Sequence, residues 1–421
     1  MSDEFTENST LNTNILYVHY GENWLRGSEI VLLDLLQAAK SQHQNVLLWC
    51  NSDVLADKAR SLGVEVIEDR FVCLGYWTLP KWDFRQFFKL LRKAKKLIRE
   101  HGISLVHCNN GAPCQWMAPI CKLTKIPLLL HLHARYMFRD RLTLLFHGAD
   151  NIIGVSQAVI NIFKKNEFNQ QSVGVIYNGI NENRVLSAHP KNIRAETSAS
   201  KQDFVMLYVG SLIKRKGVDQ LLYAVANLKA AYPMKLAIVG SGSEEVELRK
   251  LAKQLQLDKQ VKFFPNSDNV ANWYSTNADC FISVPSEEVF GLTLAEASIA
   301  KLPVITSNIP GVNEIYQDKK HALLVPPKDT TALINAIKRL INSKTLRAEL
   351  AQTAHDHIKE SFSLAHQYQS FRHAYHSLSL ASNKQKTVQR LFLHGITLLK
   401  ALVNKSYQSL LVKFSWEKRH D

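Results

Sequence analysis

Pro-Ser-Glu-Glu-Val-Phe-Gly-Leu-Thr-Leu-Ala-Glu, residues 285–296, joins an apolar run to a segment whose apolar residues have helical spacing. The apolar run, residues 280–284, is typical of a buried strand, and Pro285 ends it. Gly291 gives the backbone freedom to turn, and a helix is predicted from Leu292 onward. The first N–H groups of such a helix have no intrahelical partner, so they and the helix dipole bind phosphate. This connection therefore predicts an anion-binding turn.

Two carboxylates flank the turn, with Glu288 in the loop and Glu296 about one turn into the helix. Carboxylates are poor phosphate ligands, but they accept hydrogen bonds from sugar hydroxyls. Phosphate-binding N–H groups between two hydroxyl-binding carboxylates suit a nucleotide-sugar. The simpler alternative is an ordinary strand–loop–helix connection with two surface glutamates.

Two glutamates eight residues apart around Phe290, Gly291 and Leu292, after a strand that ends in Pro-Ser, resemble the signature of the retaining glycosyltransferases of family 4. The resemblance covers about residues 14–378, and its C-terminal half is the specific part. It implies an α/β protein with the GT-B fold, in which two Rossmann-like domains with parallel sheets face a central cleft. It also implies retaining transfer from a nucleoside-diphosphate sugar, which is a substrate, with no cofactor and no metal requirement.

The composition is that of an ordinary globular protein. A chain of 421 residues suggests two or three domains, and 46% hydrophobic residues provide an ample core. Residues 1–14 are polar and do not resemble a signal peptide, and no uncharged apolar run reaches the ~18 residues of a membrane span. The 6 cysteines form no Cys-x-x-Cys pair, which predicts core residues in a reducing compartment rather than a disulfide framework or zinc site. We therefore expect a cytoplasmic protein.

The net charge is +15, from 52 basic and 37 acidic residues, and it is concentrated in two segments. Residues 81–100 and residues 384–421 each carry a net charge of +6. Clustered positive charge favours an anionic partner, which can be a membrane, a nucleic acid or a polyphosphate. Because no nucleic-acid-binding motif is present, we expect an anionic membrane surface as a partner, with the protein peripheral on the cytoplasmic face of the inner membrane.

The first basic segment contains a predicted amphipathic helix at residues 83–101. Phe84, Phe87 and Phe88 recur with aliphatic residues on one side, and basic residues surround the rest. One interpretation is a helix that packs on the sheet and covers these aromatics, and the other is docking on lipid headgroups. Residues 384–421 leave the same two interpretations open, with a partner protein as a further one.

The first predicted strand, residues 15–19, is followed by a glycine-containing loop and a helix. A loop of this kind suits phosphate binding. In the family this place usually carries Gly-Gly before a small residue and Glu, and it faces the acceptor. Here Arg26 replaces the first glycine and Gly27 keeps the second, so both are candidate residues of an acceptor or phosphate loop.

The predicted strand at residues 126–133 ends with two histidines on one face, His131 and His133. The carboxyl edge of a parallel sheet faces a ligand crevice. The family has a histidine at the end of this strand, facing the donor sugar, and His133 matches it. A hydrogen-bonded structural histidine is the alternative.

Alternation restarts with a predicted strand at residues 204–209, followed by a loop with three cations. Such a loop suits a pyrophosphate. The resemblance assigns Lys216 to the leaving diphosphate, with Arg215 supplying a second charge because Ser211 stands where the family has arginine. A solvated turn is the alternative. Gly240 begins the Gly-x-Gly turn that the family has after the next strand.

The resemblance assigns roles to eleven residues. The catalytic residues are Glu288, His133 and Lys216. The donor-binding residues are Arg215, Lys216, Gly240, Phe290, Gly291, Leu292 and Glu296. The acceptor loop contributes Arg26 and Gly27, and no residue is assigned to a metal.

We expect an acceptor domain at residues 1–183, a nucleotide-sugar domain at 184–361, a helix crossing back at 362–380 and a basic extension at 381–421. The polar stretch 187–203 is expected to complete the linker between the domains. The predicted function is transfer of a hexose from a nucleoside-diphosphate sugar to a glycan or lipid-linked acceptor in polysaccharide or lipopolysaccharide biosynthesis. The alternatives are an epimerase or phosphorylase on the same fold, and a nucleic-acid-binding protein.

Overall fold

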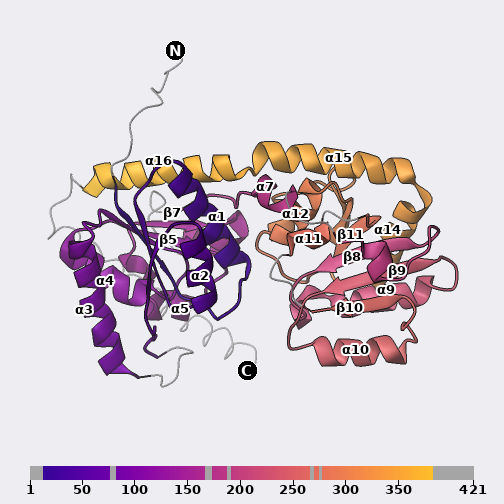
Figure 1. Cartoon of the computed structure of the whole chain (residues 1–421), viewed down its shortest axis with the longest axis horizontal. Helices are drawn as coiled ribbons and strands as arrows, with labels where there is room; N and C mark the ends of the chain where they lie inside the picture. Colours follow the sequence, from indigo (N-terminus) through magenta and orange to yellow (C-terminus); the bar gives the residue numbers. More distant parts are fainter. Residues whose placement is uncertain are drawn as a thin grey trace, which may run out of the picture. The chain divides into compact units, whose positions relative to one another are not determined.

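The computed structural model describes residues 13–75, 82–165, 173–186, 191–265, 270–274 and 277–382. The chain divides into two units, which Figure 1 colours by sequence. Unit 1 takes the chain up to Ile176 and again from Tyr368, whereas unit 2 comprises Tyr177–Gln367. The predicted extension at residues 381–421 lies outside the described residues, apart from its first two.

Unit 1 is built on a 7-stranded parallel sheet with the order β3-β2-β1-β4-β5-β6-β7. At its centre Tyr17 lies opposite Leu48 on one side and His107 on the other. The central strands are almost entirely buried, as expected of a parallel sheet that is covered on both faces. The strands are β1 (Ile15–His19), β2 (Val46–Cys50), β3 (Glu65–Glu68), β4 (Leu105–Cys108), β5 (Leu128–Leu132), β6 (Asn151–Gly154) and β7 (Val173–Val175).

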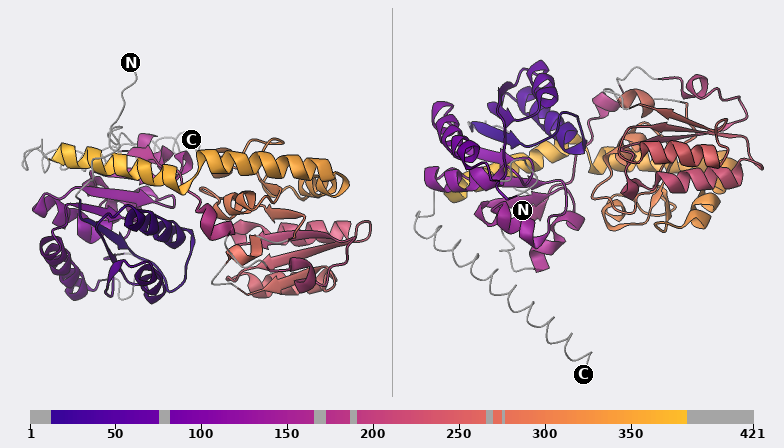
Figure 2. Two further views of the ribbon diagram at one scale, coloured as in Figure 1. Left: turned by 45° about the horizontal axis from the view of Figure 1, so that its top comes forward. Right: turned by 90° about the horizontal axis from the view of Figure 1, so that it is seen from below.

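Helices lie on both faces of this sheet (Figure 2). Tyr375, in the last helix, packs on the sheet and its hydroxyl lies 2.7 Å from Nδ1 of His107. On β2 and the fourth helix, Trp49 and Trp116 meet in a buried aromatic cluster with Phe71. The helices are α1 (Gly27–Ser41), α2 (Asp53–Ser61), α3 (Phe84–Glu100), α4 (Cys114–Thr124), α5 (Phe138–Thr143), η1 (Phe146–Gly148), α6 (Gln157–Lys165) and the part of α16 (Leu364–Ser382) from Tyr368.

Unit 2 has a 6-stranded parallel sheet with the order β10-β9-β8-β11-β12-β13. Its strands are β8 (Phe204–Val209), β9 (Met234–Val239), β10 (Val261–Phe264), β11 (Cys280–Ser283), β12 (Val304–Ser307) and β13 (Leu323–Val325). Its helices are α7 (Glu182–Leu186), α8 (Ile193–Glu196), η3 (Lys214–Lys216), α9 (Val218–Leu228), α10 (Glu245–Gln254), α11 (Ala271–Tyr274), α12 (Leu292–Ile299), α13 (Pro310–Asn313), α14 (Thr330–Asn342) and α15 (Lys344–Ser361).

Both sheets reverse their strand order at one place. The reversal lies between β1 and β4 in unit 1 and between β8 and β11 in unit 2. Connections that leave neighbouring strands in opposite directions open a crevice at their carboxyl ends, and this is where open α/β sheets bind ligands. The predicted alternation of strands and helices is therefore confirmed, and the two switch points indicate where a site can form.

The predicted linker at residues 187–203 is wrong over its described part, because residues 191–203 pack on unit 2. Asn192 caps α8 through a hydrogen bond from Ala195 N, and Ile193 is fully buried. Arg194 forms an ion pair of 2.6 Å with Asp279, next to β11. Because the segment is mostly polar, its sequence did not indicate this short helix. One buried side chain and one ion pair hold the helix on unit 2.

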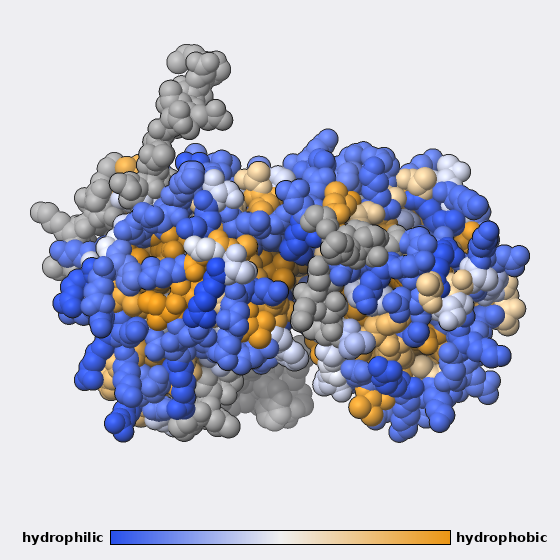
Figure 3. Space-filling model, in the orientation of Figure 1, coloured by the Kyte–Doolittle hydropathy of each residue, from blue (hydrophilic) through white to orange (hydrophobic). Residues whose placement is uncertain are grey.

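The amphipathic helix predicted at residues 83–101 is confirmed as α3, which Asp83 caps. The interpretation that the sheet covers its aromatics is wrong for two of them, since Phe84 and Phe88 are exposed. The buried side of α3 consists instead of four small or aliphatic residues further along the helix, Leu90, Ala94, Leu97 and Ile98. Figure 3 shows mostly hydrophilic residues over the end of unit 1 where α3 lies.

All six cysteines are buried and free, which confirms them as core residues. Over the part of the chain that the structure describes, no helix is both long enough and apolar enough to cross a membrane.

Candidate active site

Two turns of unit 2 lie against each other at the switch point between β8 and β11. The side chain of Lys216, in η3, forms an ion pair of 2.6 Å with Oε2 of Glu288. The main chains also meet, because Ser286 N donates to the carbonyl oxygen of Arg215 at 2.8 Å. The guanidinium of Arg215 donates to the carbonyl oxygen of Glu287 at 3.0 Å. The predicted cationic turn and the predicted anion-binding turn therefore form one structure.

Two glycines allow this close approach. Gly217 has φ +66° and a side chain there would collide with the carbonyl oxygen of Val284. A side chain at Gly311, in α13, would collide in the same way with the carbonyl oxygen of Glu288. Only glycine fits both positions, so the backbone around Glu288 is held from two sides.

Glu288 is ionised in this arrangement. Burial raises the pKa of its carboxyl, but the Lys216 ammonium and the nearby Arg215 guanidinium outweigh that effect, and the pKa lies below its usual value. Oε1 also accepts a hydrogen bond of 3.0 Å from Val289 N. The carboxylate therefore positions the Lys216 ammonium beside the turn that leads into α12.

The start of α12 has the geometry that the sequence predicted. Gly291 caps the helix with φ +91°, a conformation that side chains rarely adopt. The N–H groups of Phe290, Gly291 and Leu292 have no hydrogen-bond partner among the described residues. The ring of Phe290 is buried between Tyr177 and Phe362, which anchors the turn from inside. Free N–H groups at a helix start suit an anion, and the Lys216 ammonium is held by Glu288, two residues before this turn.

Glu296 lies in α12 and is almost fully buried. Arg184, from α7, forms an ion pair of 2.8 Å with its Oε1. Burial and the nearby Glu296 carboxylate hold the pKa of Tyr274 well above its usual value, so that hydroxyl remains protonated. Sequence reasoning missed Arg184, because no periodicity connects it with residue 296. The pair forms only because α7 and α12 pack together.

Gly240, at the end of β9, lies where a side chain would collide with the carbonyl oxygen of Gly210. The two strand ends therefore pack backbone against backbone. This close contact explains by packing why a glycine stands at this position.

The other predicted site residues, His133, Arg26 and Gly27, belong to unit 1. His133 directly follows β5, is partly exposed, and its Nε2 lies 3.2 Å from Oδ1 of Asn109. Its ring centroid lies 4.1 Å from that of His131. Burial, and then the proximity of His131, hold the pKa of His133 well below its usual value, so the ring is neutral at pH 7.

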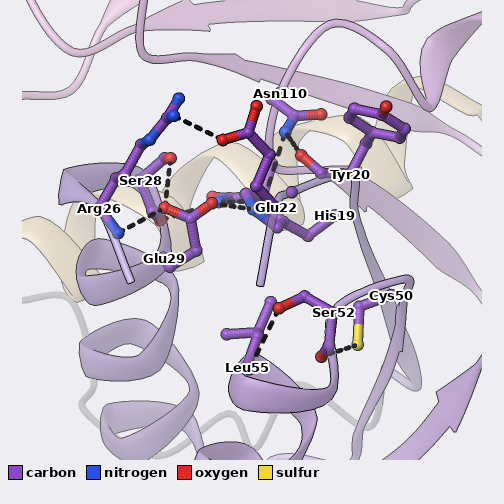
Figure 4. Close-up of polar contacts among 12 residues, drawn as sticks. His19, Tyr20, Glu22, Arg26, Ser28, Glu29, Cys50, Ser52, Leu55 and Asn110 are labelled. Carbon is purple, nitrogen blue, oxygen red and sulfur yellow. Dashed lines mark hydrogen bonds and ion pairs between the residues drawn. The ribbon is translucent and has the colours of Figure 1, made fainter. Parts of the chain in front are cut away.

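The loop that leads into α1, predicted to bind the acceptor or a phosphate, is organised by a carboxylate (Figure 4). Glu29 Oε2 accepts hydrogen bonds from Arg26 N at 3.0 Å and from the Ser28 hydroxyl at 2.9 Å. Its Oε1 lies 2.9 Å from Nε2 of the fully buried His19. Although burial raises the pKa of Glu29, these bonds lower it to about 2. The main chain before α1 thus comes close enough to donate to the Glu29 carboxylate, and this contact holds the start of the helix at Gly27.

The side chain of Arg26 points away from this carboxylate. Its guanidinium pairs with Glu22 at 2.6 Å (Figure 4). It also lies over the ring of Trp24, 4.7 Å from the ring centroid. Sequence reasoning placed Arg26 and Gly27 correctly at the start of a helix, but it missed His19 and Asn109. The only signal for His19 was a histidine at the end of a strand.

Among the described residues, no three His, Cys, Asp or Glu side chains are grouped so that they could hold a metal ion.

Two protein-family models match the chain. The model described as Glycosyltransferase Family 4 matches residues 25–184, and the model described as Glycosyl transferases group 1 matches residues 190–357. Together they account for more than half of the chain, and the boundary between them falls near the start of unit 2.

Individual proteins agree with these models. The chain is 22% identical over 284 residues to the N-acetyl-alpha-D-glucosaminyl L-malate synthase of Bacillus anthracis, with 65% of this chain and 74% of that protein covered. It is 28% identical over 243 residues to the O-antigen biosynthesis glycosyltransferase WclY of Escherichia coli, with 58% and 63% covered.

A solved structure supports the fold. The crystal structure of Anabaena Alr3699/HepE in complex with UDP and glucose superposes with a TM-score of 0.73 at 20% identity. The match covers 87% of this chain and 100% of that chain. Two parallel Rossmann-like sheets, the turn around Glu288 and the two family models lead to one conclusion: the chain belongs to family 4 of the glycosyltransferases and has the GT-B fold.

Proposed function

We propose that this glycosyltransferase transfers a hexose from a nucleoside-diphosphate sugar, with retention of the anomeric configuration, to a glycan or lipid-linked acceptor. The observation that carries the proposal is the contact of 2.6 Å between Lys216 and Glu288 beside the start of α12. A cation and free N–H groups at one place suit a diphosphate. The carboxylates of Glu288 and Glu296 on either side suit sugar hydroxyls.

In the proposed mechanism, the bond between the anomeric carbon and the diphosphate breaks while negative charge develops on the leaving group. Lys216, with Arg215, and the N–H groups of Phe290 to Leu292 stabilise that charge. They supply positive charge from the protein itself, so we propose that the reaction requires no metal. Glu288 binds the sugar, and Glu296 binds the ribose.

On the side of unit 1, we propose that His133 contacts the donor sugar and that the loop with Arg26 and Gly27 contributes to acceptor binding. The neutral ring of His133 suits a hydroxyl rather than an anion, because it carries no charge. The guanidinium of Arg26 is more than half exposed, so it is accessible to a phosphate on the acceptor.

The names of similar proteins support the choice of donor and pathway. The Anabaena structure contains UDP and glucose, and WclY is named for O-antigen biosynthesis. We accordingly propose a role in cell-surface polysaccharide or lipopolysaccharide biosynthesis, at the cytoplasmic face of a membrane.

The membrane proposal is supported by the start of α3 and by Trp82, just before its cap. Trp82, Phe84 and Phe88 are 63%, 52% and 54% exposed. Exposed basic residues share this helix, among them Arg85 and Lys89. Exposed aromatics beside cations are what an amphipathic helix presents to anionic lipid headgroups.

The function is tested with purified protein and UDP-, GDP- and ADP-sugars, with and without lipid-linked acceptors. We expect one donor to be consumed, with faster consumption when an acceptor is present and no loss in EDTA. Activity that EDTA abolishes and Mg²⁺ restores would contradict metal independence. Conversion of the donor into an isomer without any acceptor would instead favour an epimerase.

A further inference from the structure

A chain of hydrogen bonds in unit 1 connects the carboxylate of Glu29 to the ring of His133. Glu29 bonds to Nε2 of His19, whose Nδ1 lies 3.1 Å from the amide nitrogen of Asn109. The amide oxygen of Asn109 then lies 3.2 Å from Nε2 of His133. His19 and Asn109 are fully buried, and the chain crosses the carboxyl ends of β1, β4 and β5. The mechanism proposed above uses only the last residue of this chain.

The contact of Asn109 with Ser28 determines which way its amide points. The amide nitrogen lies 3.1 Å from the main-chain carbonyl oxygen of Ser28, which can only accept a hydrogen bond. The NH₂ group must therefore face Ser28, and its second hydrogen is directed to Nδ1 of His19. That nitrogen accordingly accepts, and Nε2 of His19 carries the proton that it donates to Glu29. The amide nitrogen of Asn110, a second donor group that faces this acceptor, lies 3.5 Å from the same Nδ1.

The same orientation determines the proton position on His133. The amide oxygen of Asn109 can only accept, so Nε2 of His133 must be protonated to donate to it. Because burial and the nearby ring of His131 keep the pKa of His133 low, the ring holds a single proton at pH 7. Its Nδ1 is then a lone-pair acceptor, and this nitrogen has no hydrogen-bond partner among the described residues.

We propose that Asn109 is a positioning residue, held by Ser28 and by the His19–Glu29 pair, that keeps His133 in the Nε2–H tautomer so that Nδ1 accepts a hydrogen bond from a hydroxyl of the substrate. The identity of that hydroxyl as one on the donor sugar rests on the proposed function. The proton position itself does not, because it follows from the carbonyl group of Ser28.

The tautomer is measured directly by ¹⁵N–¹H correlation spectra of the histidine-labelled full-length protein, in which the two neutral tautomers give different patterns. The signal of His133 is assigned by its loss in His133→Gln. We expect the neutral Nε2–H pattern at pH 7 in the wild type. An Nδ1–H pattern, or a doubly protonated ring, in the wild-type protein would overturn the proposal.

Two variants of neighbouring residues test the cause. Asn109→Leu removes the acceptor and should convert the His133 signal into a mixture of tautomers. Asn110→Ala is the matched control, because Asn110 bonds to the carbonyl oxygen of Tyr20 and lies 3.5 Å from Nδ1 of His19 but does not bond to His133 among the described residues, so it should leave the pattern unchanged. An unchanged Nε2–H pattern in a folded Asn109→Leu protein would show that Asn109 does not set the tautomer.

Kinetics separate this inference from the proposed function. Asn109→Leu should lower kcat/KM about 10- to 100-fold with the intact donor. The loss in kcat/KM should be much smaller with the monodeoxy donor that lacks the recognised hydroxyl. An equal loss with every deoxy donor would overturn the hydroxyl assignment. A wild-type Nε2–H tautomer in a protein that transfers no sugar would contradict the proposed function and leave the positioning of His133 intact.

Discussion

The ammonium of Lys216 lies 2.6 Å from the carboxylate of Glu288, although 72 residues separate them in the sequence. Both follow strands that are neighbours at the switch point of unit 2, so the contact is a consequence of the strand order. Glu288 compensates the charge of Lys216 in the free protein. A diphosphate at the start of α12 would share that cation, and this is where we locate the leaving group.

Replacing Lys216 by alanine should lower kcat by about 10²- to 10³-fold, since one donor to the developing charge is lost. The matched control is Lys214→Ala, which removes an exposed cation from the same turn. We expect the control to retain nearly all activity. Both variants are compared by steady-state kinetics, with thermal unfolding to verify that they fold. If Lys216→Ala turned over substrate as fast as the control, Lys216 would have no role in the mechanism.

Glu29→Gln should destabilise unit 1 at neutral pH. The pKa of Glu29 is lowered from 4.5 to about 2 on folding, and a shift of this size corresponds to about 3 kcal/mol. Because the folded value is the lower one, the stabilisation is fully present above pH 4.5 and is lost as the pH falls toward 2. Urea unfolding at pH 7 and at pH 3 should therefore show a larger difference between variant and wild type at pH 7.

The control for this experiment is Glu22→Gln, because the carboxylate of Glu22 is exposed and pairs with Arg26 at the surface. An exposed pair of this kind contributes less than about 1 kcal/mol. A pH-independent effect of Glu29→Gln would mean that its ionised form is not what stabilises the start of α1.

Arg184→Met should leave the buried carboxylate of Glu296 without a cation. Breaking a pair of this kind typically costs ~3–5 kcal/mol, and replacing the second partner as well restores part of it. We thus expect the double variant with Glu296→Gln to be more stable than Arg184→Met alone. Chemical denaturation of the two single variants and the double variant measures this coupling, and simple additivity would show that the two side chains act independently.

Arg85→Glu with Lys89→Glu should weaken binding to anionic vesicles more than tenfold at low salt, since each basic residue near such a surface contributes ~1 kcal/mol. The control makes the same charge change on α10 of unit 2, with Lys250→Glu and Lys253→Glu. Both variants are compared by vesicle co-sedimentation. Equal binding by the two would exclude α3 as the docking surface, and no binding by the wild type would refute the membrane proposal.

The sequence was sufficient to predict elements whose pattern is local. The start of α12 at Leu292, the helix from residue 83, the turn at Gly291 and the cationic turn before Gly217 each depend on a few adjacent residues. Their meeting at the switch point followed from strand alternation. These features are confirmed because hydrophobic period, glycine and proline positions all agree there.

Pairs between distant segments were not predictable. The contacts of His19 with Glu29 and Asn109 depend on how helices and strand ends pack, and so does the ion pair of Arg184 with Glu296. No spacing in the sequence indicates that packing. The interpretation that the sheet covers the aromatics of α3 was wrong for Phe84 and Phe88 for a related reason. Both precede Leu90, the first buried residue of this helix, and periodicity alone does not reveal where along a helix the buried side begins.

The central claim is that a diphosphate rests on the N–H groups of residues 290–292 next to Lys216. A crystal structure of the full chain soaked with its nucleotide-sugar, or with UDP, tests it most directly. The account predicts phosphate oxygens within hydrogen-bond distance of those N–H groups and of the Lys216 ammonium. A nucleotide bound anywhere else in the chain, with this turn unoccupied, would contradict it.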